Sequence, residues 1–292
     1  GNITINTNDL KISGKLGIFA ETKGESNAGT LTLTPYKTNP DLNITFTEKG
    51  FISARTKSLG KGGDLNILAP ENINLKGDGQ ITVESEGSGD AGIINIETEN
   101  LTIAENTKIS ASTSDSGNGG EIKINSSETF QLEGQILTES TGTGDGGIIN
   151  IEAGEITAPN STISAKSTGA GNAGTIDITA QGDITTGVVT SAAKNNIETA
   201  DGGSISITSQ QGKINATREI QSFSEGGNAG DVTLKAKADI TANTISSHGK
   251  QKGAQITIIS EAGNIDTSSG NFLANYSGGG DAGDITIEAP QG

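Results

Sequence analysis

Apolar residues recur along the chain in short alternating groups, which glycine-rich polar segments separate. The clearest group is a five-residue anchor, Gly-x-Ile-x-Ile, in which Leu or Val replaces Ile in some copies. Alternation of this kind predicts short β-strands with one buried face. Copies of the anchor span the whole chain and begin at Gly1, Gly29, Gly63, Gly92, Gly120, Gly147, Gly174, Gly203, Gly230, Ala254 and Gly283.

Successive anchors lie 24 to 34 residues apart, so the eleven anchors bound ten repeats. Two further apolar pairs follow each anchor; after Gly92 they are Leu101 with Ile103 and Ile109 with Ala111. A strand this short cannot bury a face alone, but coils that stack in parallel form one continuous core. The repeat therefore predicts an all-β, single-stranded parallel β-helix, a β-solenoid with three short strands per coil. Ten coils at about 4.8 Å per coil give a rod roughly 50 Å long.

The composition agrees with a thin, elongated core. The chain has 43 glycines, 31% apolar residues other than glycine, and 3% aromatic residues. Cysteine is absent, which excludes disulfides and thiolate metal sites. Methionine is also absent, and neither end resembles a cap. We therefore expect residues 1–292 to be one continuous segment of a longer array, with any export signal outside it.

Two coils depart from the regular pattern. The longest, Gly29 to Gly63, contains Pro35 and Pro40, which predict an outward loop because proline cannot donate to a strand ladder. The shortest, Gly230 to Ala254, has a polar loop predicted at Ser247–Lys252. Local core or corner packing is expected for the aromatic residues near these coils, Phe46, Phe51, Phe223, Phe272 and Tyr276.

A column of turn residues lies two positions before the anchor glycines. Asn and Asp tolerate left-handed backbone and hydrogen-bond to nearby main chain, so they are typical of tight turns. Stacking predicts a stabilising ladder in which alternating Asp and Asn roughly double the spacing between like charges. The ladder consists of Asn27, Asp90, Asn118, Asp145, Asn172, Asp201, Asn228 and Asp281, with Lys61 and Lys252 at the two remaining positions.

The ladder aspartates are also candidate calcium ligands. The segments GSGDAGIINI at Gly87 and GTGDGGIINI at Gly142 are similar to the glycine-aspartate repeat of calcium-binding β-rolls. That repeat recurs every nine residues, whereas this one recurs near 28. Carboxylates isolated among asparagines would give sites of low affinity. The candidates are Asp90, Asp145, Asp201 and Asp281; no other metal or cofactor is predicted.

No catalytic residue is predicted. His248 is the only histidine, which excludes a multi-histidine metal site. Arg55 and Arg218 are the only arginines and lie about six repeats apart. The pairs Glu84 with Glu86 and Glu97 with Glu99 are interpreted as solvated faces.

Other classes of function are weighed against charge and surface pattern. The net charge of −16 opposes binding to nucleic acids and anionic membranes, so neither is a predicted partner. Ice binding would need a regular outward threonine array, which Lys123 and Asp177 interrupt. A lyase or hydrolase acting on polysaccharides remains an alternative; it would concentrate carboxylates and basic residues on two or three coils.

Three repeats resemble those of the filamentous-haemagglutinin-like adhesins, especially the cyanobacterial members. They are GNAGTIDITA from Gly171, GGNAGDVTLKA from Gly226 and SGNGGEIKI from Ser116. The resemblance implies a right-handed helix, two-partner secretion and display as a rod on the bacterial surface. It also implies that a secretion domain outside this chain meets an outer-membrane pore.

We therefore expect a non-enzymatic shaft of a secreted or cell-surface bacterial adhesin, associated with the outer membrane. The expected partners are cell-surface carbohydrate or other cells, with lateral or end-to-end self-association. A polysaccharide-active enzyme and a calcium-stabilised extracellular solenoid are the two alternatives.

Overall fold

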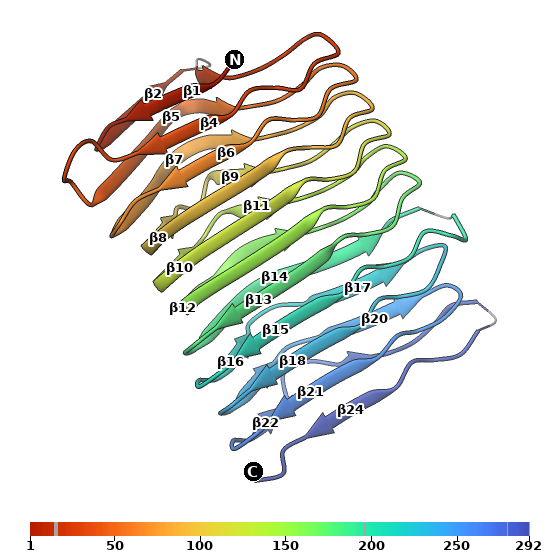
Figure 1. Ribbon diagram of the computed structural model, residues 1–292. Helices are drawn as coiled ribbons and strands as arrows, with labels where there is room; N and C mark the ends of the chain where they lie inside the picture. The colour runs from red at the N-terminus through yellow and green to blue at the C-terminus, as the bar shows by residue number, and fades with distance from the viewer. Residues whose placement is uncertain (15–16, 196, 279, 292) are drawn as a thin grey trace.

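The computed structural model describes residues 1–14, 17–195, 197–278 and 280–291, and they form a single stack of β-coils. Every strand pairing is parallel, and each joins equivalent segments of neighbouring coils. The described residues contain no helix. In Figure 1 the coils follow one another from the red N-terminal end to the blue C-terminal end. The predicted parallel β-solenoid of about ten coils is confirmed.

The anchors form the first of three faces of the solenoid. Its strands pair in chain order, so each anchor lies against the anchors before and after it. These strands are β1 (Ile3–Asn6), β4 (Leu31–Thr34), β6 (Leu65–Leu68), β8 (Ile93–Ile103), β10 (Glu121–Leu132), β12 (Ile148–Ser164), β13 (Thr175–Ala180), β15 (Ile205–Ser209), β18 (Val232–Ala236), β21 (Ile256–Ser260) and β24 (Ile285–Glu288).

The second and third faces arise from the two later apolar pairs of each repeat. The second face contains β2 (Asp9–Ser13), β16 (Ile214–Ala216), β19 (Ile240–Ala242) and β22 (Ile265–Asp266). The third contains β3 (Gly17–Phe19), β9 (Thr107–Ser110), β11 (Gln135–Leu137), β17 (Ile220–Ser224), β20 (Ile245–Gly249) and β23 (Phe272–Leu273). Both faces share β5 (Asp41–Ser53), β7 (Asn72–Thr82) and β14 (Ile184–Ala193).

Some strands continue around the corners of the coil. β12 runs through all three faces, so the predicted three short strands merge into one there. In β10 the pairing register shifts between Ser126 and Thr129, at the corner between the first and second faces. A bulge of this kind bends a strand without ending it.

The core is a set of aliphatic columns along the axis. Ile94, Ile122 and Ile149 occupy equivalent positions in successive coils, and each is fully buried. Burial of one such side chain contributes about 1.5–3 kcal/mol. The same column continues through residues of the other coils, Leu31, Leu65, Ile176, Ile205, Val232 and Ile256.

The anchor glycines are required by the close approach of adjacent coils. A Cβ atom added to Gly92 would lie 1.8 Å from the carbonyl oxygen of Gly63. A Cβ atom added to Gly120 would likewise lie 2.0 Å from the carbonyl oxygen of Gly92. A side chain there would separate the coils, which explains why the anchor begins with glycine.

The irregular coils match the sequence in part. Residues 35–40 form a loop between β4 and β5, as the two prolines predict. Phe46 is buried and Phe51 is half-buried, whereas Tyr276 is exposed, so the prediction of core or corner packing is wrong for Tyr276. Phe223 and His248 lie on strands β17 and β20, with their side chains half-buried on the outward side. The predicted loop around His248 therefore begins later, because β20 extends to Gly249.

Candidate functional site

The turn ladder joins consecutive coils through side-chain oxygens. The backbone N–H of Asn118 donates to Oδ1 of Asp90 at 2.8 Å, and that of Asp145 donates to Oδ1 of Asn118 at 2.9 Å. The N–H of Asn172 donates to Oδ1 of Asp145 at 2.7 Å. The same contact recurs at Asp201, Asn228 and Lys61, whose acceptors are Asn172, Asp201 and Asn27. Asp and Asn share this acceptor oxygen, so they alternate without loss of a contact.

The calcium candidates lie within this ladder. Asp90, Asp145 and Asp201 each use Oδ1 to accept an N–H of the next coil, and Asp281 is exposed near the C-terminal end. Calcium prefers six to eight oxygen ligands. Within the described ranges, no group of three or more His, Cys, Asp or Glu side chains is placed to bind a metal ion. Calcium binding stays a prediction.

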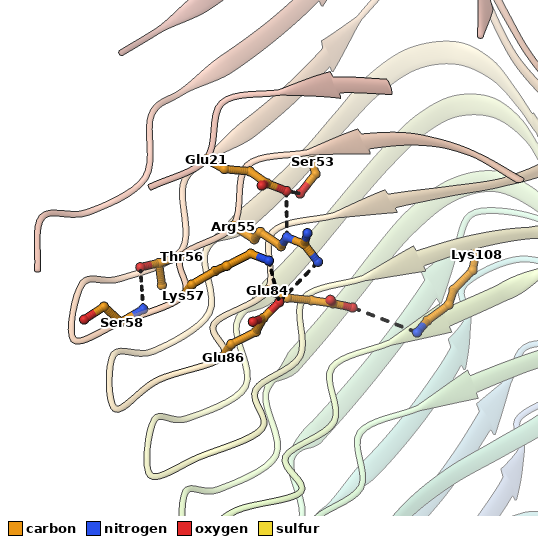
Figure 2. Close-up of polar contacts among 9 residues, drawn as sticks. All are labelled: Glu21, Ser53, Arg55, Thr56, Lys57, Ser58, Glu84, Glu86 and Lys108. Atoms are coloured by element: carbon orange, nitrogen blue, oxygen red, sulfur yellow. Dashed lines mark hydrogen bonds and ion pairs between the residues drawn. The ribbon is translucent and has the colours of Figure 1, made fainter. Parts of the chain in front are cut away.

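A stack of charged side chains follows the third face near the N-terminal end (Figure 2). Arg55 Nε lies 2.6 Å from Glu21 Oε1, and Arg55 Nη1 lies 3.2 Å from Glu86 Oε1. Ser53 also donates a hydrogen bond to Glu21, at 3.0 Å. Glu21, Arg55 and Glu86 belong to three successive coils, so one guanidinium connects all three. We call Glu21, Arg55, Glu84 and Glu86 the Arg55 stack.

Glu84 and Glu86 were predicted to form a solvated face, but both also form ion pairs. Glu86 is within 3.9 Å of Lys57 Nζ as well as bound to Arg55, and Glu84 is 3.9 Å from Lys108 Nζ. The side chain of Glu21 is 18% exposed, the least of the carboxylates in these pairs. The Arg55 stack is therefore a set of inter-coil ion pairs, and Glu21, Arg55 and Glu84 also line a hollow of about 220 Å³.

His248 takes part in a second stack across three coils. Its ring lies 5.4 Å from the ring of Phe223, centroid to centroid, with the planes 13° apart. Its Nδ1 lies 2.6 Å from Oδ1 of Asn275 in the following coil. These contacts explain the position of the single histidine as part of inter-coil packing.

An open groove lies along the bend between the first and second faces. Three hollows of about 580, 340 and 340 Å³ follow this bend and overlap. Asn125 lines all three, Glu97 lines the first two, and Glu152 lines the last two. The hollows therefore form one groove parallel to the stacking axis, from Thr34 to Gln210. We call it the axial groove.

The N-terminal end of the axial groove is bordered by the proline loop. Pro35, Lys37 and Asn39 line the first hollow. Lys37 has a left-handed backbone, with φ of 57°, and its Nζ lies 4.8 Å from the ring centroid of Tyr36. The longest coil, Gly29 to Gly63, thus forms one end of the groove.

Strand register arranges the groove side chains in rows. One row contains Glu97, Asn125, Glu152 and Thr179 at equivalent positions of four successive coils. Neighbouring members of a row are separated by about 4.8 Å. A second row, two residues earlier in each coil, contains Asn95, Lys123, Asn150 and Asp177.

The carboxylates of the groove differ from those of the Arg55 stack. In the part of the chain that the structure describes, the side chains of Glu97, Glu99, Glu152 and Asp177 have no ion pair or hydrogen bond. Lys123 is 3.0 Å from Glu121, and Asn150 donates to the same residue at 3.2 Å. The groove carboxylates are therefore free acceptors that face solvent.

Further along the rod, the row of Glu97 reaches a group of paired charges. The row continues through Thr208 to Lys235, whose Nζ lies 3.0 Å from Glu261 Oε1. Lys237 Nζ lies 3.3 Å from the other oxygen of Glu261. Hydrogen bonds from Lys235 and then Lys237 lower the pKa of Glu261 below its usual value of 4.5.

Sequence reasoning missed the axial groove because the hollow arises from the bend between two faces. Glu97 with Glu99 was interpreted as a solvated face, and both are indeed exposed. A signal was present, since alignment of the repeats on their anchors places Glu97, Asn125 and Glu152 in one row. The concave shape at that row is a property of the folded coil alone.

Comparison of the chain with protein-family models, with curated proteins and with solved structures gives no match. Across the described ranges, no helix has the length and apolar character needed to span a membrane.

Proposed function

We propose that this chain is a non-enzymatic shaft of a secreted or cell-surface bacterial adhesin of the filamentous-haemagglutinin-like type. In this function the solenoid gives mechanical reach, and its surface makes weak, repeated contacts with carbohydrate or with other cells. The acidic character of the chain, with a net charge of −16, keeps the rods soluble and apart from anionic surfaces.

The observation that carries the proposal is the continuity of the turn ladder. From Asp90 to Asn228, every coil junction has a side-chain oxygen that accepts an N–H from the next coil. These bonds add to the strand pairing and are directed along the axis. Because force along the rod acts on all junctions in series, these bonds strengthen the rod over the five junctions that they span, and the parallel strand pairing joins the coils beyond Lys61 and Lys252.

The experiment compares reach on a bacterial surface. The whole chain is inserted between an outer-membrane anchor and an epitope, and the control carries a Gly/Ser linker with the same number of residues. A flexible linker of this length has a broad distribution of spans around roughly 90–100 Å, whereas the solenoid should hold the epitope at one height of roughly 50 Å. We therefore expect the solenoid to capture antibody-coated beads within a narrow range of bead-to-membrane distances and the linker to capture them over a broad range. An equally broad range for the two cell types would contradict the proposed shaft.

A polysaccharide-active enzyme remains a second candidate, because Glu97 and Glu152 face the same groove. Two coil steps separate them by roughly 9–10 Å, close to the upper limit of about 9.5 Å for the carboxyl pair of an inverting glycosidase. Linear polysaccharides are incubated with the chain, and new chain ends are measured. Cleavage that Glu152→Gln abolishes would overturn the non-enzymatic proposal.

A further inference from the structure

We infer that the axial groove binds a linear polysaccharide rich in hydroxyl and amino groups, with its chain parallel to the solenoid axis. The inference deepens the proposed function and rests on it in one respect, since such a groove gives the shaft a site of carbohydrate contact. It concerns binding alone and requires no bond to be broken.

The shape of the groove selects an extended, unbranched ligand. The three hollows share Asn125 and together extend along successive coils, the second and third lying beside each other where both are lined by Glu152 and Thr179. Their rows repeat at the coil spacing of about 4.8 Å. A compact ligand would occupy one hollow, whereas a linear polymer contacts the repeated side chains of several coils at once.

The chemistry of the lining selects donor groups. The groove carboxylates accept hydrogen bonds only, whereas the amides of Asn95, Asn125 and Asn150 both donate and accept. Hydroxyl groups satisfy the amides, and ammonium groups satisfy the free carboxylates. An acidic polymer would be repelled by the carboxylates of the groove. Two lysines, Lys37 and Lys123, line the groove, and Lys123 is already paired with Glu121.

A peptide strand is the less suitable occupant. An extended peptide binds to sheets by adding to a free edge, but the groove follows the outward faces of strands whose backbones pair with both neighbours. A peptide would therefore have to satisfy its backbone groups with side chains alone, whereas sugar hydroxyls suit such partners.

The first experiment measures binding of the whole chain to three linear oligosaccharides of equal length by calorimetry. The probes are an amino-bearing glucosamine oligomer, a neutral glucose oligomer and an acidic galacturonate oligomer, at mildly acidic pH and low salt. We expect the affinity to fall in that order, and to rise with oligomer length. Equal binding of all three, strongest binding of the acidic oligomer, or binding only of an extended cationic peptide would overturn the inference.

The second experiment fills the groove without loss of the fold. In Asn125→Arg the new guanidinium lies between Glu97 and Glu152 of the two neighbouring coils. Arg55 likewise bridges carboxylates of its two neighbouring coils, Glu21 and Glu86. We expect the affinity for the glucosamine oligomer to fall by about tenfold or more, because like charges are then juxtaposed. The matched control is Gln135→Arg, at an exposed position of the same coil on the third face. Equal loss in the control, or no loss in Asn125→Arg, would contradict the inference.

The third experiment removes charge without a change of volume. The double variant Glu97→Gln with Glu152→Gln should weaken binding of the glucosamine oligomer by about threefold to tenfold, as expected for two exposed ion pairs. The double variant Glu105→Gln with Glu133→Gln makes the same change at exposed positions outside the groove and should keep full affinity. None of these variants alters the turn ladder, so the binding result is independent of the bead-capture test of the shaft.

Discussion

The third face and the first face share one arrangement of three adjacent coils. In both, the outer two coils each have a glutamate and the middle coil has a different residue at the equivalent position. On the third face the order is Glu21, Arg55 and Glu84; the guanidinium pairs with Glu21 of the coil before and with Glu86, two residues beyond Glu84, in the coil after. On the first face it is Glu97, Asn125 and Glu152, and the carboxylates remain free. The two surfaces thus differ in the side chain of the middle coil. With Arg55 the carboxylates are paired and stabilise the rod, whereas with Asn125 they remain available to a ligand.

The largest effect is expected when the Arg55 stack loses its cation. Arg55→Met leaves Glu21 half-buried without its ion pair, so the free energy of unfolding should fall by about 1–2 kcal/mol. The measurement is a urea unfolding curve followed by circular dichroism. Arg218→Met is the control, because Arg218 is the other arginine and is exposed. A similar loss in both variants would show that the stack has no special role.

A second contrast lies within a single coil, between Asn118 of the turn ladder and Asn125 of the groove. Asn118 accepts the N–H of Asp145 through Oδ1, whereas the side chain of Asn125 faces the open groove. The same amide therefore has a structural role at one position and a solvent-facing role at the other.

Asn118→Leu should lower the free energy of unfolding by about 1 kcal/mol, because one inter-coil hydrogen bond is lost. Asn125→Leu should change it by no more than about 0.5 kcal/mol, as is usual for exposed positions. Hydrogen exchange checks the location, since the amide of Asp145 should exchange faster in Asn118→Leu alone. Unchanged exchange at Asp145 would contradict the ladder contact.

A smaller effect is expected when the groove is given the arrangement of the Arg55 stack. Asn125→Arg should raise the free energy of unfolding by about 0.5 kcal/mol, because exposed ion pairs contribute little. The gain should decrease at high salt, which screens exposed charges. Thermal unfolding at two salt concentrations measures it; a loss of stability would mean that the two rows are not equivalent.

The coil architecture could be predicted from the sequence because its determinants are local and repeated. The aliphatic pairs after Gly92 indicate which residues face inward, and Leu101, Ile103 and Ile109 are all fully buried. The position of the ladder also followed from spacing, since a fixed offset from the anchor becomes a stacked column. The bonding between coils required coordinates, because it depends on which N–H each oxygen reaches.

The surface sites were harder to predict, because they depend on side chains from different coils. Arg55 lies just beyond the end of β5, and its contacts with Glu21 and Glu86 cross 34 and 31 positions of the sequence. His248 was expected in a polar loop, but its packing on Phe223 crosses a coil junction and extends β20. The repeat length varies from coil to coil, so outward partners cannot be aligned as simply as the inward anchors.

The smallest effect concerns Glu261, which pairs with Lys235 of the groove row and with Lys237. Lys235 and Lys237 lower the pKa of Glu261 in the folded state. A lowered carboxyl pKa stabilises the fold above the unfolded value of 4.5, and the contribution is lost as the pH falls through the folded pKa. Glu261→Gln should therefore be slightly less stable than the unaltered chain near neutral pH and equal to it at strongly acidic pH. Unfolding midpoints across this range provide the measurement, and a difference that grows on acidification would contradict the pairing of Glu261 with the two lysines.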